Sequence, residues 1–157
     1  MKRRWFLFFV VLLALLLAAC TASRTSGDHS SLQLYFLSAK ENGPAIVTQS
    51  CHGAPSTPES LLQALLSGPS EDSLRSPFPK GLTLQGCTLE DTHLTVDFSE
   101  AYGGLTDVAL TLADYCVVLT VCQLDGIDSV EITVSGRPLS YRSQQILTVH
   151  DAILATQ

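Results

Sequence analysis

Short runs in this chain alternate between apolar and polar residues. Residues at every second position share one face of a β-strand, so each run predicts a half-buried strand. The clearest is His93 to Phe98, where Leu94, Val96 and Phe98 alternate with polar residues. The five predicted strands cover 31–38, 45–49, 82–89, 93–98 and 130–134.

Two further segments carry apolar residues at helical spacing. The first follows Thr57, which is suited to cap a helix, and ends at Gly68 and Pro69. The second runs from about Thr106 to Cys122. Its expected solvent side carries Asp107, Thr111 and Asp114, and its expected buried side carries Leu112, Tyr115, Cys116 and Leu119.

The segments between these elements read as turns and loops. Glu41 to Pro44 predicts a turn, and residues 70–81, with two prolines, predict an ordered loop. The tail near 146–154 suits either a short strand or a helix. The predicted order is β-β-α-β-β-α-β. It favours an α+β fold in which two helices cover one face of a small mixed sheet.

The first 20 residues have the features of an export signal. Lys2, Arg3 and Arg4 precede a charge-free apolar run over 5–19, and the run ends in Leu-Ala-Ala-Cys at Cys20. This pattern predicts a lipoprotein signal peptide over 1–19, cleaved before Cys20, whose thiol carries a diacylglyceryl lipid. A plain secretory signal and an uncleaved membrane helix stay open, although a spanning helix needs about 20 apolar residues.

The residues that follow Cys20 divide into a tether and a domain. Residues 20–30 are rich in serine and threonine and predict a flexible tether. No second linker follows, so 31–157 is expected to form one domain. The expected location is the extracytoplasmic face of the cell membrane, with membrane lipid bound through Cys20.

The charge of the chain limits its partners. All 15 acidic residues follow Cys20 and three of the nine basic residues precede it, so cleavage changes the net charge from −6 to −9. Such an acidic surface predicts no binding of nucleic acid or of anionic lipid head groups.

Four cysteines remain after Cys20. Cys116 and Cys122 lie six residues apart in one predicted helix, about 9 Å along its axis, which is too far for a disulfide. We therefore expect two buried thiols there. Cys51 beside His52 is interpreted as a loop cysteine, because two potential metal ligands without a second pair are a weak signal.

No group of residues predicts catalysis. Asp97 ends a strand and is expected to accept backbone N–H bonds, and Tyr102 is either packed in the core or exposed at a contact surface. The histidines are spread along the chain and are expected at the surface; they are His29, His52, His93 and His150. We therefore expect no enzyme activity, no cofactor and no metal.

The order and spacing of several short motifs resemble the GerMN domain of the GerM sporulation and spore germination family. The resemblance covers about residues 32–140. The motifs are Leu34-Tyr35-Phe36, residues 61–69, Pro79-Lys80-Gly81, Thr95-Val96-Asp97-Phe98-Ser99, Val118-Leu119-Thr120, Gly126-Ile127 and residues 130–136. The cysteines at 51, 87, 116 and 122 are not part of that family pattern.

The resemblance implies a domain related to ring-building modules of sporulation secretion complexes. Such domains bind or assemble at membrane surfaces, so the expected partners are envelope or membrane-surface proteins, with self-assembly as a further option. Two alternatives stay open. An envelope hydrolase acting on peptidoglycan or peptides would need clustered acid and base groups, and a small-ligand carrier would need a sizeable pocket.

Overall fold

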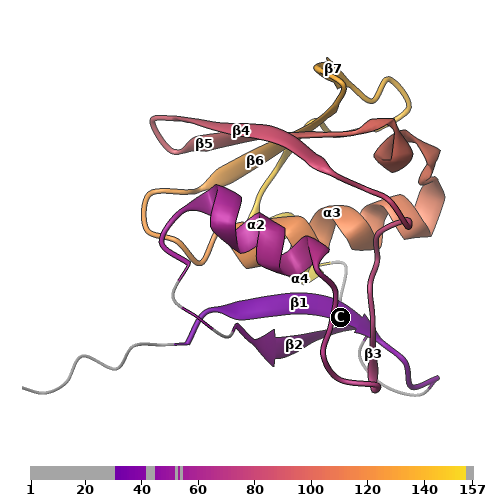
Figure 1. The fold of residues 1–157 in the computed structure, drawn as a ribbon. Helices are drawn as coiled ribbons and strands as arrows, with labels where there is room; N and C mark the ends of the chain where they lie inside the picture. Colours follow the sequence, from indigo (N-terminus) through magenta and orange to yellow (C-terminus); the bar gives the residue numbers. More distant parts are fainter. Residues whose placement is uncertain (1–30, 42–44, 52, 54, 155–157) are drawn as a thin grey trace, which may run out of the picture. The chain divides into compact units, whose positions relative to one another are not determined.

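The strands of the domain form two sheets, with helices between them (Figure 1). The computed structural model describes residues 31–41, 45–51, 53 and 55–154. These belong to one compact unit that begins at Ser31. The signal peptide, Cys20, the tether 20–30, His52 and residues 42–44 of the predicted turn lie outside the described residues, so those assignments stay predictions.

The first sheet has three antiparallel strands in the order β2-β1-β3. β1 (Gln33–Ser38) and β2 (Ile46–Ser50) lie where the alternation predicts them, and Leu34 and Phe36 are buried on one face. β3 (Leu74–Arg75) corrects the expectation of a continuous loop over 70–81, because it pairs with the end of β1. Two residues are too few for a sequence pattern to show.

The second sheet is mixed, as predicted. Its strands in order are β4 (Leu84–Glu90), β5 (His93–Phe98), β6 (Ser129–Val134) and β7 (Arg137–Pro138), with β8 (Ile146–Leu147) also pairing with β6. β5 and β6 are parallel, so the chain must cross over between them, which it does through α3. Leu94, Val96 and Phe98 are fully buried on the helix side.

α2 (Pro58–Leu66) begins and ends at the predicted residues. Thr57 caps it: its hydroxyl accepts the Ser60 N–H at 3.2 Å, and the Ser60 hydroxyl accepts the Thr57 N–H at 3.2 Å. Gly68 follows with φ +86°, a left-handed conformation that suits glycine after a helix. Leu61, Leu62 and Leu65 form its buried face.

α3 (Asp107–Val121) is buried around most of its circumference, because it packs against β1, β6 and α2. Apolar residues therefore occur on all its sides. The expectation of helices on one face of a single sheet is changed accordingly: the α+β class is confirmed, but the first hairpin forms a second sheet on the other side of the helices (Figure 1). The placement of Asp114 on the solvent side was wrong, since that residue is 4 % exposed.

Two short helices complete the fold. The 3-10 helix η2 (Glu100–Gly104) connects β5 to α3, and α4 (Val149–Leu154) follows β8. The tail thus contains both a short strand and a helix, the two options that the sequence left open.

Side chains from the end of α3 close part of the β1 edge that β3 does not reach. Gln123 bonds both backbone groups of Gln33: its Oε1 accepts the Gln33 N–H at 2.9 Å and its Nε2 donates to the Gln33 carbonyl at 2.7 Å. The Thr120 hydroxyl accepts the Tyr35 N–H at 3.2 Å. An edge whose groups are satisfied in this way offers few bonds to another strand.

Candidate binding surface

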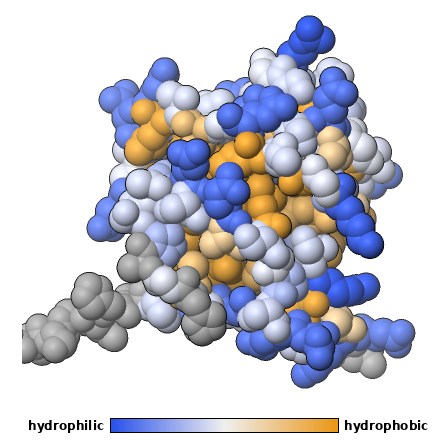
Figure 2. Space-filling view, in the orientation of Figure 1, coloured by the Kyte–Doolittle hydropathy of each residue, from blue (hydrophilic) through white to orange (hydrophobic). Residues whose placement is uncertain are grey.

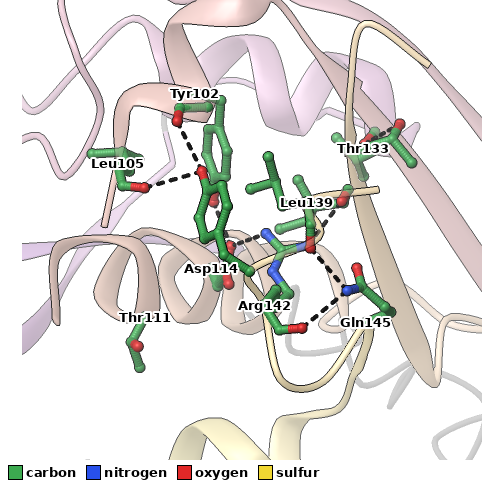
Figure 3. A network of polar contacts seen from close by, with 12 residues as sticks. Tyr102, Leu105, Thr111, Asp114, Thr133, Leu139, Arg142 and Gln145 are labelled. Carbon is green, nitrogen blue, oxygen red and sulfur yellow. Dashed lines mark hydrogen bonds and ion pairs between the residues drawn. The ribbon is translucent and has the colours of Figure 1, made fainter. Parts of the chain in front are cut away.

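A buried polar network joins α3 to the C-terminal segment (Figure 3). The Tyr102 hydroxyl donates to Asp114 Oδ1 at 2.7 Å, and Arg142 Nη2 donates to the same oxygen at 2.8 Å. Arg142 Nη1 donates to the Ile132 carbonyl at 2.8 Å. The network thereby ties η2, α3, β6 and the segment after β7 together.

Tyr102 belongs to the core of the domain. Its side chain is 0 % exposed and stacks on Phe98 with ring centroids 4.9 Å apart. The packing interpretation of Tyr102 is therefore the one that the structure supports, and the exposed-contact interpretation is wrong. Burial, followed by the nearby Asp114 carboxylate, raises the pKa of Tyr102 well above its usual range, so its hydroxyl stays protonated.

The charges of the network are used within the protein. Burial raises the pKa of Asp114, and the Arg142 guanidinium and the Tyr102 hydroxyl oppose that shift. Asp114 accepts from two donors, and no described serine or cysteine donates to it. A shallow pocket of about 420 Å³ lies beside the network, between the start of α3 and residues 141–143. This arrangement stabilises the fold.

Asp97 also has a structural role, with a partner the sequence did not indicate. Its Oδ1 accepts the Gly136 N–H at 2.8 Å and the Thr133 hydroxyl at 2.7 Å. It therefore accepts a backbone N–H, but from the turn after the neighbouring strand β6 rather than from the loop that follows its own strand. Ser135 and Gly136 in that turn both have positive φ, typical of a tight hairpin turn.

The outer face of the second sheet brings together three residues that the sequence analysis did not connect. His93 Nδ1 lies 2.9 Å from Ser129 Oγ, and His93 Nε2 lies 3.7 Å from Glu131 Oε2. A serine hydroxyl beside a histidine that in turn contacts a carboxylate is the arrangement found in serine hydrolases. Here the three side chains lie, partly exposed, on the face of the strands. They line neither the pocket beside Asp114 nor the cleft between α2 and β4 that is described below. Only the parallel register of β5 and β6 reveals the group.

Cysteine and metal chemistry have little support in the described part of the chain. Burial raises the pKa of Cys116 to about 12, and burial with the nearby Asp128 raises that of Cys122 to about 11. Both therefore stay thiols at neutral pH. Cys116 is fully buried, as predicted, whereas Cys122 is only partly buried. Among the residues that the structure describes, no three His, Cys, Asp or Glu side chains form a group that could hold a metal ion. No described helix could span a bilayer.

The edge strand β4 is the clearest candidate for binding. β5 pairs with one side of it, and within the described residues no hydrogen bond joins its other side to another segment. It has seven residues and contains no proline or lysine. Proline and lysine are two of the means by which proteins keep a sheet edge from pairing. A bulge at Gln85 is the one interruption of its register with β5.

A shallow cleft lined by both leucine and polar side chains lies beside this edge. The side chains of β4 that face the helices are only partly buried, whereas their partners on β5 are fully buried. The cleft has a volume of about 390 Å³ and lies between the end of α2 and the start of β4. Its lining is half apolar (Leu66, Leu82 and Leu84) and half polar (Gln63, Ser67 and Thr83). In Figure 2, hydrophobic side chains reach the surface across the middle of the face that carries α2.

The edge and cleft together form what we call the β4 surface, defined by strand Leu84–Glu90 with Leu66 and Leu82. Its residues were predicted as a strand and the end of a helix, but nothing in the sequence showed that the strand lies at an edge. That property depends on the order of strands in the sheet. The one available signal was Leu89, an apolar residue directly before the polar turn at 90–92.

Comparison with protein families identifies a match over most of the domain. The model of the family called Germane, described as sporulation and spore germination, matches residues 33–140. This range includes both sheets except β8, together with α2 and α3. A comparison with curated proteins finds no match.

Solved structures show the same fold. A protein from Clostridium perfringens described as a lipoprotein has 24 % identity and a TM-score of 0.53, over 76 % of this chain and 87 % of that one. The first GerMN domain of the sporulation protein GerM from Bacillus subtilis has 19 % identity and a TM-score of 0.58, over 74 % and 96 %. The tandem GerMN domains of GerM have 19 % identity and a TM-score of 0.57, over 80 % of this chain and 48 % of the tandem.

Proposed function

Because the chain belongs to the Germane family of sporulation and spore germination, we propose that it is a lipid-anchored binding and assembly module of the cell envelope. The Leu-Ala-Ala-Cys motif at Cys20 supports the anchor, and residues 20–30 would separate the lipid from the domain. The protein would then act on the extracytoplasmic face of the cell membrane, in sporulation or spore germination.

The observation that carries the binding role is the open edge of β4 beside a shallow cleft that contains three leucines. An exposed strand edge binds an added strand through backbone hydrogen bonds, while neighbouring pockets select its side chains. The Asp114 carboxylate and the backbone groups of Gln33 on β1 have hydrogen-bond partners, whereas this edge is unpaired within the described residues. The proposed partners are envelope proteins at the membrane surface.

Lipid attachment is tested by metabolic labelling with a radioactive or alkynyl fatty acid. The full-length protein should incorporate the label and fractionate with membranes, because the lipid is attached to the Cys20 thiol. Cys20→Ala should lose the label. Label retained on Cys20→Ala would exclude this anchor, whereas Cys122→Ala serves as the control that keeps the label.

The binding role is tested by site-specific photocrosslinking in the sporulating native host. A photoreactive amino acid at Thr88, exposed on β4, should give defined protein adducts in membranes. The same amino acid at Asp125, exposed in the turn after α3, is the matched control. Adducts at position 88 alone support the proposal; equal adducts at both positions, or none at either, contradict it.

A second candidate function is an envelope hydrolase, favoured by the arrangement of His93, Ser129 and Glu131. It would require a substrate cleft and donors for the developing oxyanion near Ser129. The purified full chain is expected to leave peptidoglycan fragments and peptides intact. Turnover that disappears in a stably folded Ser129→Ala variant would establish the hydrolase instead.

A further inference from the structure

The β4 surface is complementary to itself. Leu89 is an exposed apolar side chain, 45 % accessible, at one end of β4, and the leucines of the cleft, Leu84 among them, lie at the other end beside polar side chains. In the ladder with β5, Leu84, Cys87 and Leu89 stand opposite Phe98, Val96 and Leu94. Those three partners are fully buried, so all three β4 residues belong to the helix side of the sheet.

The same ladder fixes the spacing along the edge. On β5, Phe98 and Leu94 each lie two positions from Val96. Their partners on β4, Leu84 and Leu89, therefore lie equally far along the strand from Cys87, because the extra residue Gln85 is taken up by the bulge. A second β4 that pairs antiparallel with Cys87 opposite Cys87 therefore brings each Leu89 opposite the Leu84 of the other copy. The two-fold axis of such a pair is perpendicular to the sheet, which keeps both helix layers on the same side.

We propose that the partner of the β4 surface is a second copy of this chain, joined by antiparallel pairing of the two β4 strands around Cys87. This inference names the partner of the assembly function proposed above and rests on that function. Each Leu89 covers the Leu66–Leu82–Leu84 cleft of the other copy, and the unpaired backbone groups of both edges become hydrogen-bonded.

The charged and polar side chains of this face act on the pair in different ways. Thr83 extends the β4–β5 ladder by one position, because it is hydrogen-bonded to Ser99. In the proposed pair, Glu90 at the end of each β4 therefore stands opposite Thr83 of the other copy. No like charges therefore meet directly across the two strands. α2 exposes Glu59, Ser60 and Gln63, and Glu59 lies near enough to Cys87 to raise the pKa of that thiol. The two Glu59 carboxylates therefore approach each other near the two-fold axis and oppose the pair.

The β-bulge and the net charge of each copy both weaken the association of the two copies. The Gln85 bulge shortens the regular part of the ladder. Each copy also has a net charge of −9 after cleavage before Cys20, so repulsion opposes association and added salt should favour it. Anchoring both copies in one membrane raises their effective concentration, which suits a weak interface.

The register makes a covalent test available. Directly opposite residues of antiparallel strands have Cα atoms about 4.5–5.5 Å apart, within the range of disulfides. In membranes of cells that express the full-length protein, copper–phenanthroline should oxidise the two Cys87 thiols to a disulfide. Two protons and two electrons leave the thiols, and the electrons pass to the copper oxidant. A dimer band on a non-reducing gel is the expected result, at pH 8.5 because burial and Glu59 raise the pKa of Cys87.

Three variants decide the origin of the band. Cys87→Ser should abolish it, and both Leu89→Lys and Leu89→Ala should reduce it at least five-fold. Ile146→Lys is the matched control: Ile146 is 52 % exposed in β8, away from the β4 edge, and its variant should cross-link like the wild type.

Several outcomes would overturn the pairing. They are a dimer band that persists in Cys87→Ser or Leu89→Lys, and a wild-type protein that stays monomeric although a maleimide labels Cys87 completely. Photocrosslinking at Thr88 keeps the two proposals separate. Adducts with a different protein and no dimer would disprove self-pairing and leave the assembly function standing, whereas the absence of any adduct would count against both.

Discussion

The two sheets of this domain treat their edges in opposite ways. Along β1, the side chains of Gln123 and Thr120 bond backbone groups that no strand reaches. Along β4, no described side chain or strand does so. The β1 edge is bonded within the domain by side chains in and just after α3. The β4 edge has backbone groups that are free to pair with an added strand.

α3 is the source of this difference. Its length places Asp114 beside Arg142 and Thr120 beside β1, and Gln123 follows just after its end. Side chains in and just after α3 therefore bond to Arg142 and to the β1 edge. β4 packs against α2, whose buried face is made of leucines and offers no hydrogen-bonding group to the strand. Substitutions near α3 should therefore change stability, and substitutions on β4 should change association.

The largest expected effect on the α3 side is that of Asp114→Ala. The variant leaves Arg142 buried without its counter-charge, which costs about 3–5 kcal/mol of unfolding free energy. Urea denaturation followed by circular dichroism measures it. Asp72→Ala, at an exposed carboxylate, is the control and should change stability by less than about 0.5 kcal/mol. A loss below about 1 kcal/mol for Asp114→Ala would show that the pair is not essential to the fold.

Gln123→Ala tests the closed edge directly. It removes the partners of the Gln33 N–H and carbonyl, and leaving such groups unsatisfied costs about 1–3 kcal/mol. Gln63→Ala, at an exposed position of α2, should cost less than about 0.5 kcal/mol. Equal stability of the two variants would mean that water replaces Gln123 at the β1 edge without loss.

Leu89→Lys should have the smallest effect on stability and a large one on association. Leu89 is nearly half exposed, and lysine on an edge strand is well tolerated, so the unfolding free energy should change by less than about 0.5 kcal/mol. The same denaturation experiment, at low protein concentration, measures it. A loss of more than about 2 kcal/mol would place Leu89 in the core and remove it from the β4 surface.

Much of the fold is visible in the sequence because it depends on local patterns. The alternation in β5 sets which residues are buried, and Thr57, Pro58 and Gly68 mark the ends of α2 through local hydrogen bonding and backbone geometry. These features need no knowledge of distant residues. The α+β class follows from them, and the family resemblance agrees with it.

The features that the sequence did not show all depend on distant partners. Asp114 is charged and therefore seemed exposed, but Arg142, 28 residues later, makes its burial tolerable. The structure has two sheets rather than the predicted one, because α3 is apolar on more than one side. The prediction gave α3 a polar face and therefore only one buried side. The open edge of β4 and the group of His93, Ser129 and Glu131 exist only once strand order and register are set.

Hydrogen exchange of the full chain, resolved to single amides by mass spectrometry, tests the contrast between the two edges most directly. At low protein concentration, the amides of Gln33 and Tyr35 should be protected, and alternate amides of β4 should exchange rapidly. Those β4 amides should become protected as the concentration rises, and stay unprotected in Leu89→Lys. Uniform protection of β4 in the monomer, or rapid exchange at Gln33 and Tyr35, would contradict the account.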